Sequence, residues 1–204
     1  MSVSFSKSET MQNLMRAFAG ESQARNRYTF AAAVCKKQKL QVLEAIFTFT
    51  AGQELAHAQV FHQHLSALNG QNIEIDGAYP VTWTNTVLDH LQQSVHNEQE
   101  EAAVVYPAFE QIAREEGFPQ VAESFHQIAA IEQSHAQRFR TFQQLLAQNK
   151  LFVSDTVCGW MCLNCGHIFT GKEAPKVCPV CGHDQGFFIR LELAPYSDLT
   201  LLQK

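Results

Sequence analysis

Apolar side chains recur every three or four positions along four stretches of the chain between residue 8 and about residue 148. This spacing keeps one face of an α-helix apolar and therefore predicts four amphipathic helices. They extend over residues 11–35, 43–68, 87–112 and 121–146. Helices of this kind are stable when their apolar faces pack together, so the pattern predicts a four-helix bundle.

Turn-forming residues between the predicted helices limit how they connect. Few residues around Lys39 separate the first two helices, and Gly117-Phe118-Pro119 makes a short turn between the last two. Each pair is therefore predicted to be antiparallel. The segment from Gly70 to Thr82 reaches roughly 40 Å when extended, enough for one long crossover of the ferritin-like kind. Pro107 predicts a kink in the third helix because proline removes a backbone N–H.

After Lys150 the helical spacing ends. Glycines, cysteines and short β-prone pieces such as Phe187–Leu191 replace it, which is typical of a small β/loop domain. We expect a domain boundary near Phe152. The predicted organisation is an all-α four-helix bundle over residues 1–151, followed by a small β/loop domain over residues 152–204.

The composition excludes several classes of partner. A net charge of -5 gives no electrostatic reason to expect nucleic acid or an anionic membrane as a partner. The first residues, MSVSFSKSETMQ, lack the apolar core of a signal peptide. No apolar run approaches the ~20 residues that span a bilayer. We therefore predict a soluble, cytoplasmic protein.

Each apolar stripe carries ionisable side chains near its middle, where core residues are expected. Burying a carboxylate costs several kcal/mol unless a positive charge compensates it, and no lysine recurs on these stripes. A metal ion supplies that charge, and carboxylates combined with imidazoles suit iron or manganese. The candidate ligands are Glu21, Glu54, His57, Glu98, Glu101, Glu132 and His135.

The spacing of two of these pairs points to two metal ions. Glu54 and His57, like Glu132 and His135, are three positions apart and so share one face of a helix. A single Glu-x-x-His pair is more often a surface pair. Two such pairs, with a facing carboxylate from each of two other helices, are the pattern of di-iron carboxylate bundles.

Glu101 lies one turn beyond Glu98 and is one carboxylate more than that six-ligand pattern requires. Spacing alone leaves open whether Glu101 is a seventh ligand or a partly exposed surface residue. The other ionisable residues considered in the helices have no comparable partner pattern, so we interpret them as ordinary. They are His62, His64, His90, His96, His126, Glu100, Glu115 and Glu116.

Five of the six cysteines cluster between Cys158 and Cys181. Two matching Cys-x-x-Cys-Gly motifs predict a four-thiolate metal site, because a reducing compartment disfavours disulfides. Such a site binds iron or zinc, and spacing does not distinguish them. Cys158 and Cys35 lie outside the motifs, and we interpret them as a spare thiol and a core residue. The predicted ligands are Cys162, Cys165, Cys178 and Cys181.

Together these motifs closely resemble the rubrerythrin family over essentially the whole chain. The sequences Gly20–Tyr28, Glu54–Ala58 and Glu132–Ala136 are similar to that family's helices, and Gly159–His183 is similar to its short-spaced rubredoxin domain. The resemblance implies a ferritin-like bundle with a C-terminal rubredoxin-like domain. It also implies two iron ions in an oxo/carboxylate-bridged site and one iron in the four-cysteine site.

The resemblance assigns a position to each ligand in the bundle. It implies that Glu54 and Glu132 bridge the two irons. Glu21 would then be a terminal ligand on one iron, and Glu98 and His135 would be ligands of the other.

Four residues are expected to take part in catalysis on the same basis. The resemblance implies that Glu101 and His57 exchange on one iron with its oxidation state. It also implies that Tyr28 and Tyr106 donate hydrogen bonds to ligand carboxylates, which is a usual way of holding ligands in place.

The activity implied by the resemblance is that of a non-heme di-iron peroxidase, which reduces hydrogen peroxide to water in defence against oxidative stress. The rubredoxin-like iron would relay electrons from rubredoxin or an NAD(P)H-dependent reductase. We expect at least a homodimer in which one chain's tail serves the other chain's bundle, because the fourth helix carries the tail well beyond its own site.

Two other functions remain open. The first is a ferritin-like iron-oxidising or iron-storage protein that uses dioxygen, against which the built-in electron carrier argues. The second is a binding module whose tail holds structural zinc, which the many candidate ligands in the bundle argue against.

Overall fold

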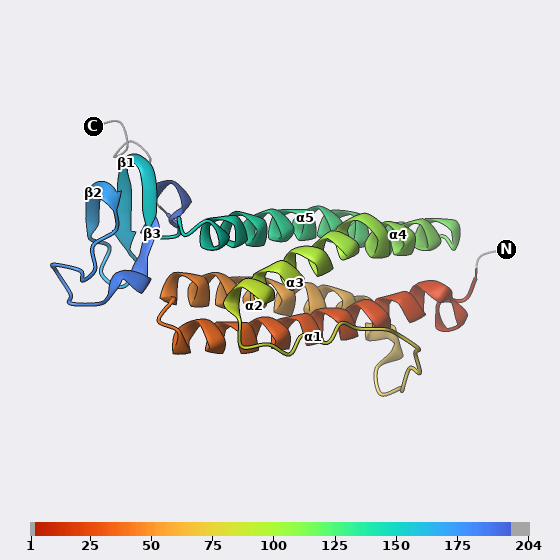
Figure 1. Cartoon of the computed structure of the whole chain (residues 1–204). Helices are drawn as coiled ribbons and strands as arrows, with labels where there is room; N and C mark the ends of the chain where they lie inside the picture. The colour runs from red at the N-terminus through yellow and green to blue at the C-terminus, as the bar shows by residue number, and fades with distance from the viewer. Residues whose placement is uncertain (1–2, 197–204) are drawn as a thin grey trace.

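An elongated bundle of helices carries a small three-stranded sheet at one end in the computed structural model, which describes residues 3–196 (Figure 1). The predicted fold class is therefore confirmed. The last eight residues of the expected C-terminal domain lie outside the described residues. The helices are α1 (Glu9–Lys37), α2 (Gln41–His64), α3 (Val87–Glu100), α4 (Tyr106–Glu115) and α5 (Pro119–Ala147), and the strands are β1 (Val153–Cys162), β2 (Ile168–Glu173) and β3 (Phe188–Arg190).

Two antiparallel helix pairs build the bundle, and one long crossover joins them. The turn between α1 and α2 is tight, with Lys39 at a φ of 57°. The crossover from α2 to α3 runs back along α1 (Figure 1). It is fastened there by an Arg16–Asp76 ion pair of 2.6 Å and by the Tyr79 hydroxyl, which donates to the Arg16 carbonyl at 3.0 Å. The predicted ferritin-like connection is thus present.

The third predicted helix is interrupted rather than simply kinked. A π-helical turn, Glu101–Val105, separates α3 from α4, and the Tyr106 N–H donates to the Glu101 carbonyl five residues before it. Pro107 follows immediately and has no N–H to offer an α-helical ladder. The wider turn shifts the hydrogen-bond register there, and such turns are frequent at functional sites.

Two apolar clusters fill the bundle, one toward each end. The cluster near the sheet includes Tyr28, Phe47 and Phe139, and the cluster at the far end includes Phe61 and Phe125. Between them lies a layer of buried polar side chains contributed by α1, α2, α3 and α5. The apolar clusters thus hold these helices rigidly on both sides of the polar layer.

The ends of two helices differ from the sequence-based expectation. The second helix was expected to reach Leu68, but α2 ends at His64 and a short 3₁₀ turn, Ser66–Leu68, follows. Glu116 was interpreted as ordinary surface. Its carboxylate instead accepts hydrogen bonds from the backbone N–H groups of Glu9 and Thr10 at 3.0 and 2.8 Å, so it caps the start of α1 from the turn that follows α4.

The small domain is an antiparallel sheet of order β2-β1-β3 that packs against the bundle. Phe152, at the expected boundary, contacts both the bundle core and the core around Trp160. Gly186 fits against the α1–α2 turn so closely that an added Cβ would lie 2.0 Å from the Lys39 carbonyl oxygen. The sheet is therefore docked on the end of the bundle.

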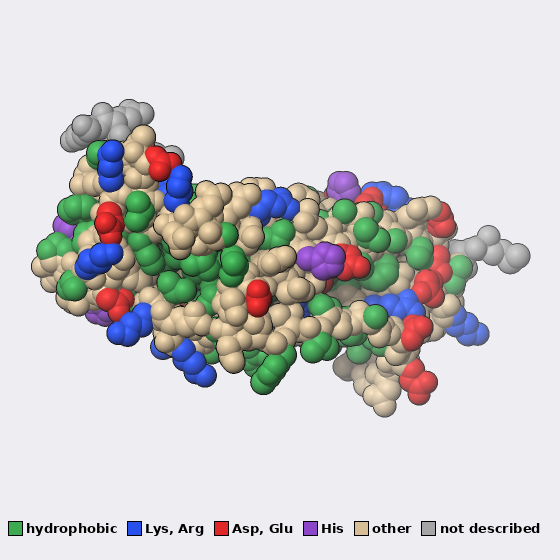
Figure 2. Space-filling view, in the orientation of Figure 1, with side chains coloured by type: hydrophobic (Ala, Val, Ile, Leu, Met, Phe, Trp, Pro, Cys, Tyr) green, Lys and Arg blue, Asp and Glu red, His purple; other side chains and the backbone are tan. Residues whose placement is uncertain are grey.

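Acidic, basic and neutral polar side chains are interspersed over the face of the molecule seen in Figure 2. This face therefore presents no broad basic area of the kind that attracts nucleic acid. Among residues 3–196, no helix combines the length and the hydropathy that crossing a lipid bilayer requires.

Candidate metal centres

The polar layer of the bundle contains six of the seven candidate ligands, all buried. Their ligand atoms form two groups, and within each group the atoms lie within 4.8 Å of one another. The groups share Glu54 and Glu132, so together they describe two adjacent sites. The members are Glu21, Glu54, His57 and Glu132 in the first group, and Glu54, Glu98, Glu132 and His135 in the second.

The two shared carboxylates each reach toward both groups. Glu132 places one oxygen 2.8 Å from His57 Nδ1 and the other 2.7 Å from His135 Nδ1. Glu54 places its oxygens 3.0 Å from His135 Nδ1 and 3.9 Å from His57 Nδ1. Two ligands that each lie ~2.1 Å from one metal, at right angles, are roughly 3 Å apart. These distances therefore suit carboxylates that would bridge two metal ions.

The ligand atoms also lack other partners. Both oxygens of Glu54 and of Glu132, and Nδ1 of His57 and of His135, are buried, and apart from one another they have no hydrogen-bond partner among residues 3–196. Polar atoms buried in this way are costly unless something satisfies them. Carboxylate oxygens with imidazole nitrogens fit iron, and the observed donor set therefore fits a pair of iron ions.

Two buried tyrosines hold the outer carboxylates. The Tyr28 hydroxyl donates to Glu98 and the Tyr106 hydroxyl donates to Glu21. Burial, followed by the neighbouring carboxylates, raises the pKa of both hydroxyls well above 10, so both remain protonated donors. Each tyrosine fixes the orientation of one candidate ligand, as the resemblance implied.

A hydrogen-bonded group behind His135 was missed in the sequence analysis. His135 Nε2–H donates to Gln53 Oε1 at 3.1 Å, and Arg138 donates to the same oxygen and to Thr50 Oγ1, each at 2.9 Å. This arrangement turns His135 Nδ1 toward the metal site. The sequence did contain an indication of this hydrogen-bonded group, because Arg138 lies about one helical turn after His135 on the same stripe.

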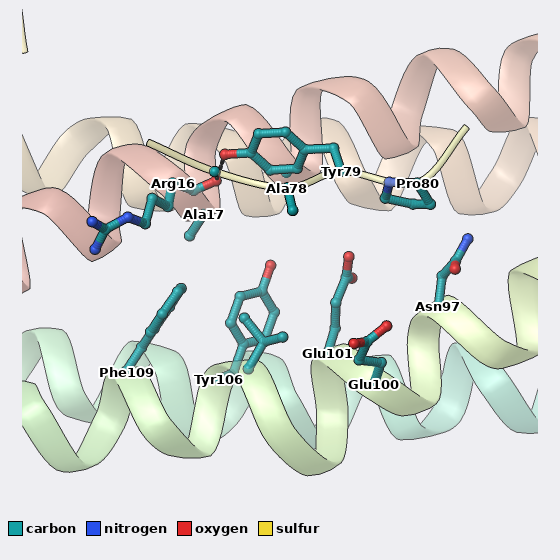
Figure 3. Close-up of a pocket in the computed structure, with 13 residues that line it drawn as sticks. Arg16, Ala17, Ala78, Tyr79, Pro80, Asn97, Glu100, Glu101, Tyr106 and Phe109 are labelled. Atoms are coloured by element: carbon teal, nitrogen blue, oxygen red, sulfur yellow. Dashed lines mark hydrogen bonds between the residues drawn. The ribbon is translucent and has the colours of Figure 1, made fainter. Parts of the chain in front are cut away.

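Glu101 is the one bundle candidate that the structure leaves outside both groups. It follows α3 in the π-helical turn and lines a cavity together with Asn97 and Tyr106 (Figure 3). Burial raises its pKa well above 4.5, and the carboxylates of Glu98 and Glu21 raise it further. Glu101 therefore lies beside the site, where burial favours the neutral form of its carboxyl group.

In the metal-free protein, the pKa values of the buried candidate ligands are shifted in different directions. Burial raises the pKa of Glu98 to about 8. Burial opposes the shift of His57, but Glu132 and Glu21 raise the pKa of that imidazole to about 10. Burial likewise opposes the shift of Glu132, but contacts with His135 and His57 lower its pKa to about 2. The folded metal-free protein consequently holds protons that bound metal would displace.

Metal-free protein is expected to lose stability as the pH rises from about 5 to about 8. In this window Glu98, with its raised pKa, holds a proton in the folded state that the unfolded state releases, so the free energy of unfolding falls with pH. His57 acts in the same direction above its ordinary pKa of 6.5. At about 1.4 kcal/mol per pKa unit, the shifts of Glu98 and His57 make this loss on the order of 5 kcal/mol.

Thermal unfolding at about pH 5.5 and about pH 8, with and without metal, measures this effect. The metal-free Tm should fall with pH, and the gap to the metal-loaded Tm should widen because metal binding displaces protons. A metal-free Tm that rises over this window would contradict the assignment.

Four cysteines of the tail form the second centre. Cys162 and Cys181 Sγ are 3.7 Å apart, as are Cys165 and Cys178 Sγ. A tetrahedron of sulfurs ~2.3 Å from a metal has edges of roughly 3.8 Å, so the sulfurs fit one metal ion. The backbone N–H of His183 lowers the pKa of Cys181 to about 5, which favours the thiolate that metal requires.

The two Cys-x-x-Cys-Gly motifs have the same backbone geometry. Gly166 donates to the Cys162 carbonyl at 2.8 Å and Gly182 to the Cys178 carbonyl at 2.9 Å. Both glycines have φ near 75°, where a side chain is disfavoured.

The remaining cysteines and histidines stay outside these centres. Cys35 is buried in the bundle core and Cys158 lies on β1 outside the cluster. Within residues 3–196, no metal-binding group includes any of the histidines interpreted as ordinary, namely His62, His64, His90, His96 and His126.

Comparison with known sequences agrees with both centres. The profile of the family Rubrerythrin matches residues 12–143, and that of the rubrerythrin rubredoxin-like domain matches residues 160–189. Rubrerythrin-1 of Clostridium acetobutylicum is 45% identical over 88% of this chain and 93% of its own length. Rubrerythrin of Porphyromonas gingivalis is 39% identical over 92% of each chain.

Solved structures share the architecture. A mixed-valence state of nigerythrin superimposes with a TM-score of 0.60 and 26% identity, covering 93% of this chain and 88% of that chain. A bacterioferritin of Desulfovibrio desulfuricans, with its di-iron site in different catalytic states, has a TM-score of 0.61. It is 20% identical and covers 70% of this chain and 82% of that chain, so it supports the fold alone.

Proposed function

Because the chain belongs to the rubrerythrin family, with a di-iron carboxylate site in its bundle and a four-cysteine iron site in its tail, we propose that it reduces hydrogen peroxide to water. One molecule of peroxide takes up two electrons and two protons and yields two molecules of water. The observation that carries the proposal is the presence, in one chain, of a buried two-metal site and a one-electron site of four cysteines. Storage of iron requires no such carrier.

The proposed roles follow the positions of the side chains. Glu54 and Glu132, which belong to both groups of ligand atoms, would hold both irons. Glu21 and Glu98 would hold one iron each and accept hydrogen bonds from Tyr106 and Tyr28. When bound, the two irons supply the two electrons that cleave the O–O bond. The bundle excludes bulk water from this layer, since its ligands are buried.

Glu101 has two proposed tasks. Its carboxyl group, whose pKa is raised by burial, holds a proton near the cavity for the departing oxygen. When iron is bound, Glu101 would also exchange with His57 as a ligand. His57, which lies in the first group of ligand atoms, would hold the ferrous iron and Glu101 the ferric iron, because hard ferric iron prefers a carboxylate.

Glu101→Ala is expected to leave the protein folded and loaded with metal, while slowing oxidation of the reduced protein by peroxide about 10- to 100-fold. Six ligands remain, but the proton and the exchange with His57 are lost. Stopped-flow absorbance after mixing with hydrogen peroxide measures the rate. Glu115→Ala is the matched control, since Glu115 lies on α4 with an exposed side chain and does not line the cavity. Equal rates in wild type and Glu101→Ala would make Glu101 only a neighbour.

The proposed electron supply passes through the tail. Rubredoxin, or an NAD(P)H-dependent reductase, delivers electrons one at a time to the four-cysteine iron, which returns them to the bundle. Thiolate ligation suits such a carrier. The proposed working unit is a homodimer or a larger assembly.

Anaerobic titration of the fully reduced protein with hydrogen peroxide tests the proposal against iron storage. Each peroxide should oxidise two of the three irons of a chain, with no oxygen gas released. Storage predicts instead that added ferrous iron accumulates far beyond three per chain, and that result would overturn the peroxidase assignment.

A further inference from the structure

A cavity of about 190 Å³ lies between the crossover, α1 and the segment from α3 to α4. Figure 3 shows the side chains of Glu101, Tyr106 and Asn97 pointing from the lower helices toward the crossover residues Ala78 and Pro80. The Tyr106 hydroxyl at its floor donates to Glu21. One end of the cavity is therefore a single hydrogen bond away from the first metal group.

The cavity is larger than hydrogen peroxide requires. A water molecule needs roughly 10–15 Å³ of such space, and hydrogen peroxide has only two heavy atoms. Part of the wall is apolar and gives hydrogen peroxide no hydrogen-bond partner, namely Ala17, Ala78, Pro80, Val105 and Phe109. The polar side chains that line the rest are Arg16, Tyr79, Asn97, Glu100, Glu101 and Tyr106. The volume of the cavity and the apolar part of its wall suit a short alkyl group.

The side-chain amide of Asn97 offers a donor that no other group among the described residues uses. Its side chain is 5% exposed, and its Nδ2 is buried without a hydrogen-bond partner. An unpaired buried amide costs free energy that a bound acceptor recovers. Asn97 directly precedes Glu98 and lines the same cavity as Glu101, so an acceptor held by its amide lies beside the proposed proton donor.

We propose that this cavity binds small alkyl hydroperoxides, with the Asn97 amide holding the hydroperoxyl group and the apolar wall enclosing the alkyl group. This rests on the proposed peroxidase function and names a further class of substrate for it. The hydroperoxide takes two electrons from the reduced irons and two protons. Its O–O bond breaks, and one alcohol and one water molecule form.

Kinetic selectivity tests the proposal in the intact, iron-loaded protein. Reduced wild type should be oxidised by tert-butyl hydroperoxide with a rate that saturates. Ala78→Leu, which fills the cavity from the crossover, should slow this reaction about tenfold or more and change the reaction with hydrogen peroxide less than about twofold. Val81→Leu is the control, since Val81 lies on the same segment, is 92% exposed and does not line the cavity.

Binding without redox chemistry is measured separately. In the zinc-loaded full-length protein, tert-butyl alcohol should shift the side-chain amide resonance of Asn97 in a saturable way, and Ala78→Leu should abolish the shift. Asn97→Leu identifies the resonance by its loss.

The outcomes separate the two proposals. Equal slowing of both peroxides by Ala78→Leu, no effect on either, or an unshifted amide would overturn the alkyl hydroperoxide site. If hydrogen peroxide itself fails to oxidise the reduced wild type, the proposed function is wrong, and the amide shift alone then decides whether the cavity binds the alkyl group.

Discussion

Glu54→Ala is expected to lower the iron content of the bundle from two ions per chain to one or none, and to slow oxidation by peroxide at least ~100-fold. Glu54 belongs to both groups of ligand atoms, so its loss weakens both iron sites at once. Removing even an outer partner of a metal ligand typically costs 10- to 100-fold. Iron analysis and stopped-flow oxidation of the reduced variant measure the two effects.

Glu44→Ala is the matched control for this variant. Glu44 lies on the same helix, and its carboxylate pairs with Lys36 on the surface at 3.3 Å. Its replacement should change neither iron content nor rate, because surface ion pairs contribute little. Retention of two bundle irons in Glu54→Ala would exclude the bridging role.

The double variant Cys162→Ser, Cys178→Ser is expected to lose steady-state turnover about 100-fold or more while keeping single-turnover oxidation by peroxide. Both thiols are buried in the four-cysteine cluster, so the tail loses its metal while the bundle keeps its own. Electrons then reach the bundle only by a slow direct route. Cys158→Ser on the same strand is the control, and it should behave as wild type. Full turnover in the double variant would remove the tail from the electron path.

A mixture of variants decides which chain's tail serves which bundle. Leu163 lines a surface pocket with Val42 and Ala45, so the tail lies closer to its own α2 than expected from the sequence. Even so, Ala45 beside the tail and Glu54 in the metal site are nine residues apart on α2, and this separates them by roughly 14 Å along the helix. Phe49 and Leu55 on α2 are 56% and 47% exposed. We propose that the tail of a second chain approaches the metal site across these two side chains, nearer than the tail of the same chain.

Co-expressed heterodimers of the double cysteine variant and Glu54→Ala are therefore expected to recover turnover that neither variant shows alone. Failure to recover any turnover would mean that each tail serves its own bundle. The turnover of heterodimers between the double cysteine variant and wild type serves as the reference, because these heterodimers contain half the normal number of working four-cysteine sites.

The helices and most candidate ligands could be predicted because the relevant signal is local. A glutamate such as Glu54 within an apolar stripe is recognisable from its neighbours three and four residues away. The two Cys-x-x-Cys-Gly knuckles are recognisable for the same reason. The helix periodicity also placed Glu132 and His135 at the right depth, because both lie in one regular helix.

Features that depend on contacts between elements could not be predicted. The π-helical turn at Glu101 follows from the change in backbone hydrogen-bond register ahead of Pro107. The hydrogen bond from Arg138 to Gln53 joins two helices that are far apart in sequence. The unpaired amide of Asn97 is visible only once the crossover covers it.

In the proposed function, the bundle reduces peroxide and the four-cysteine iron of the tail returns electrons to the bundle. Both steps can be followed by stopped-flow mixing of the fully reduced protein with either hydrogen peroxide or dioxygen, recorded at wavelengths that separate the two iron centres. Peroxide should react much faster than dioxygen, the bundle irons should oxidise first, and the four-cysteine iron should follow. Faster oxidation by dioxygen, or a four-cysteine iron that oxidises before the bundle, would contradict the proposed function.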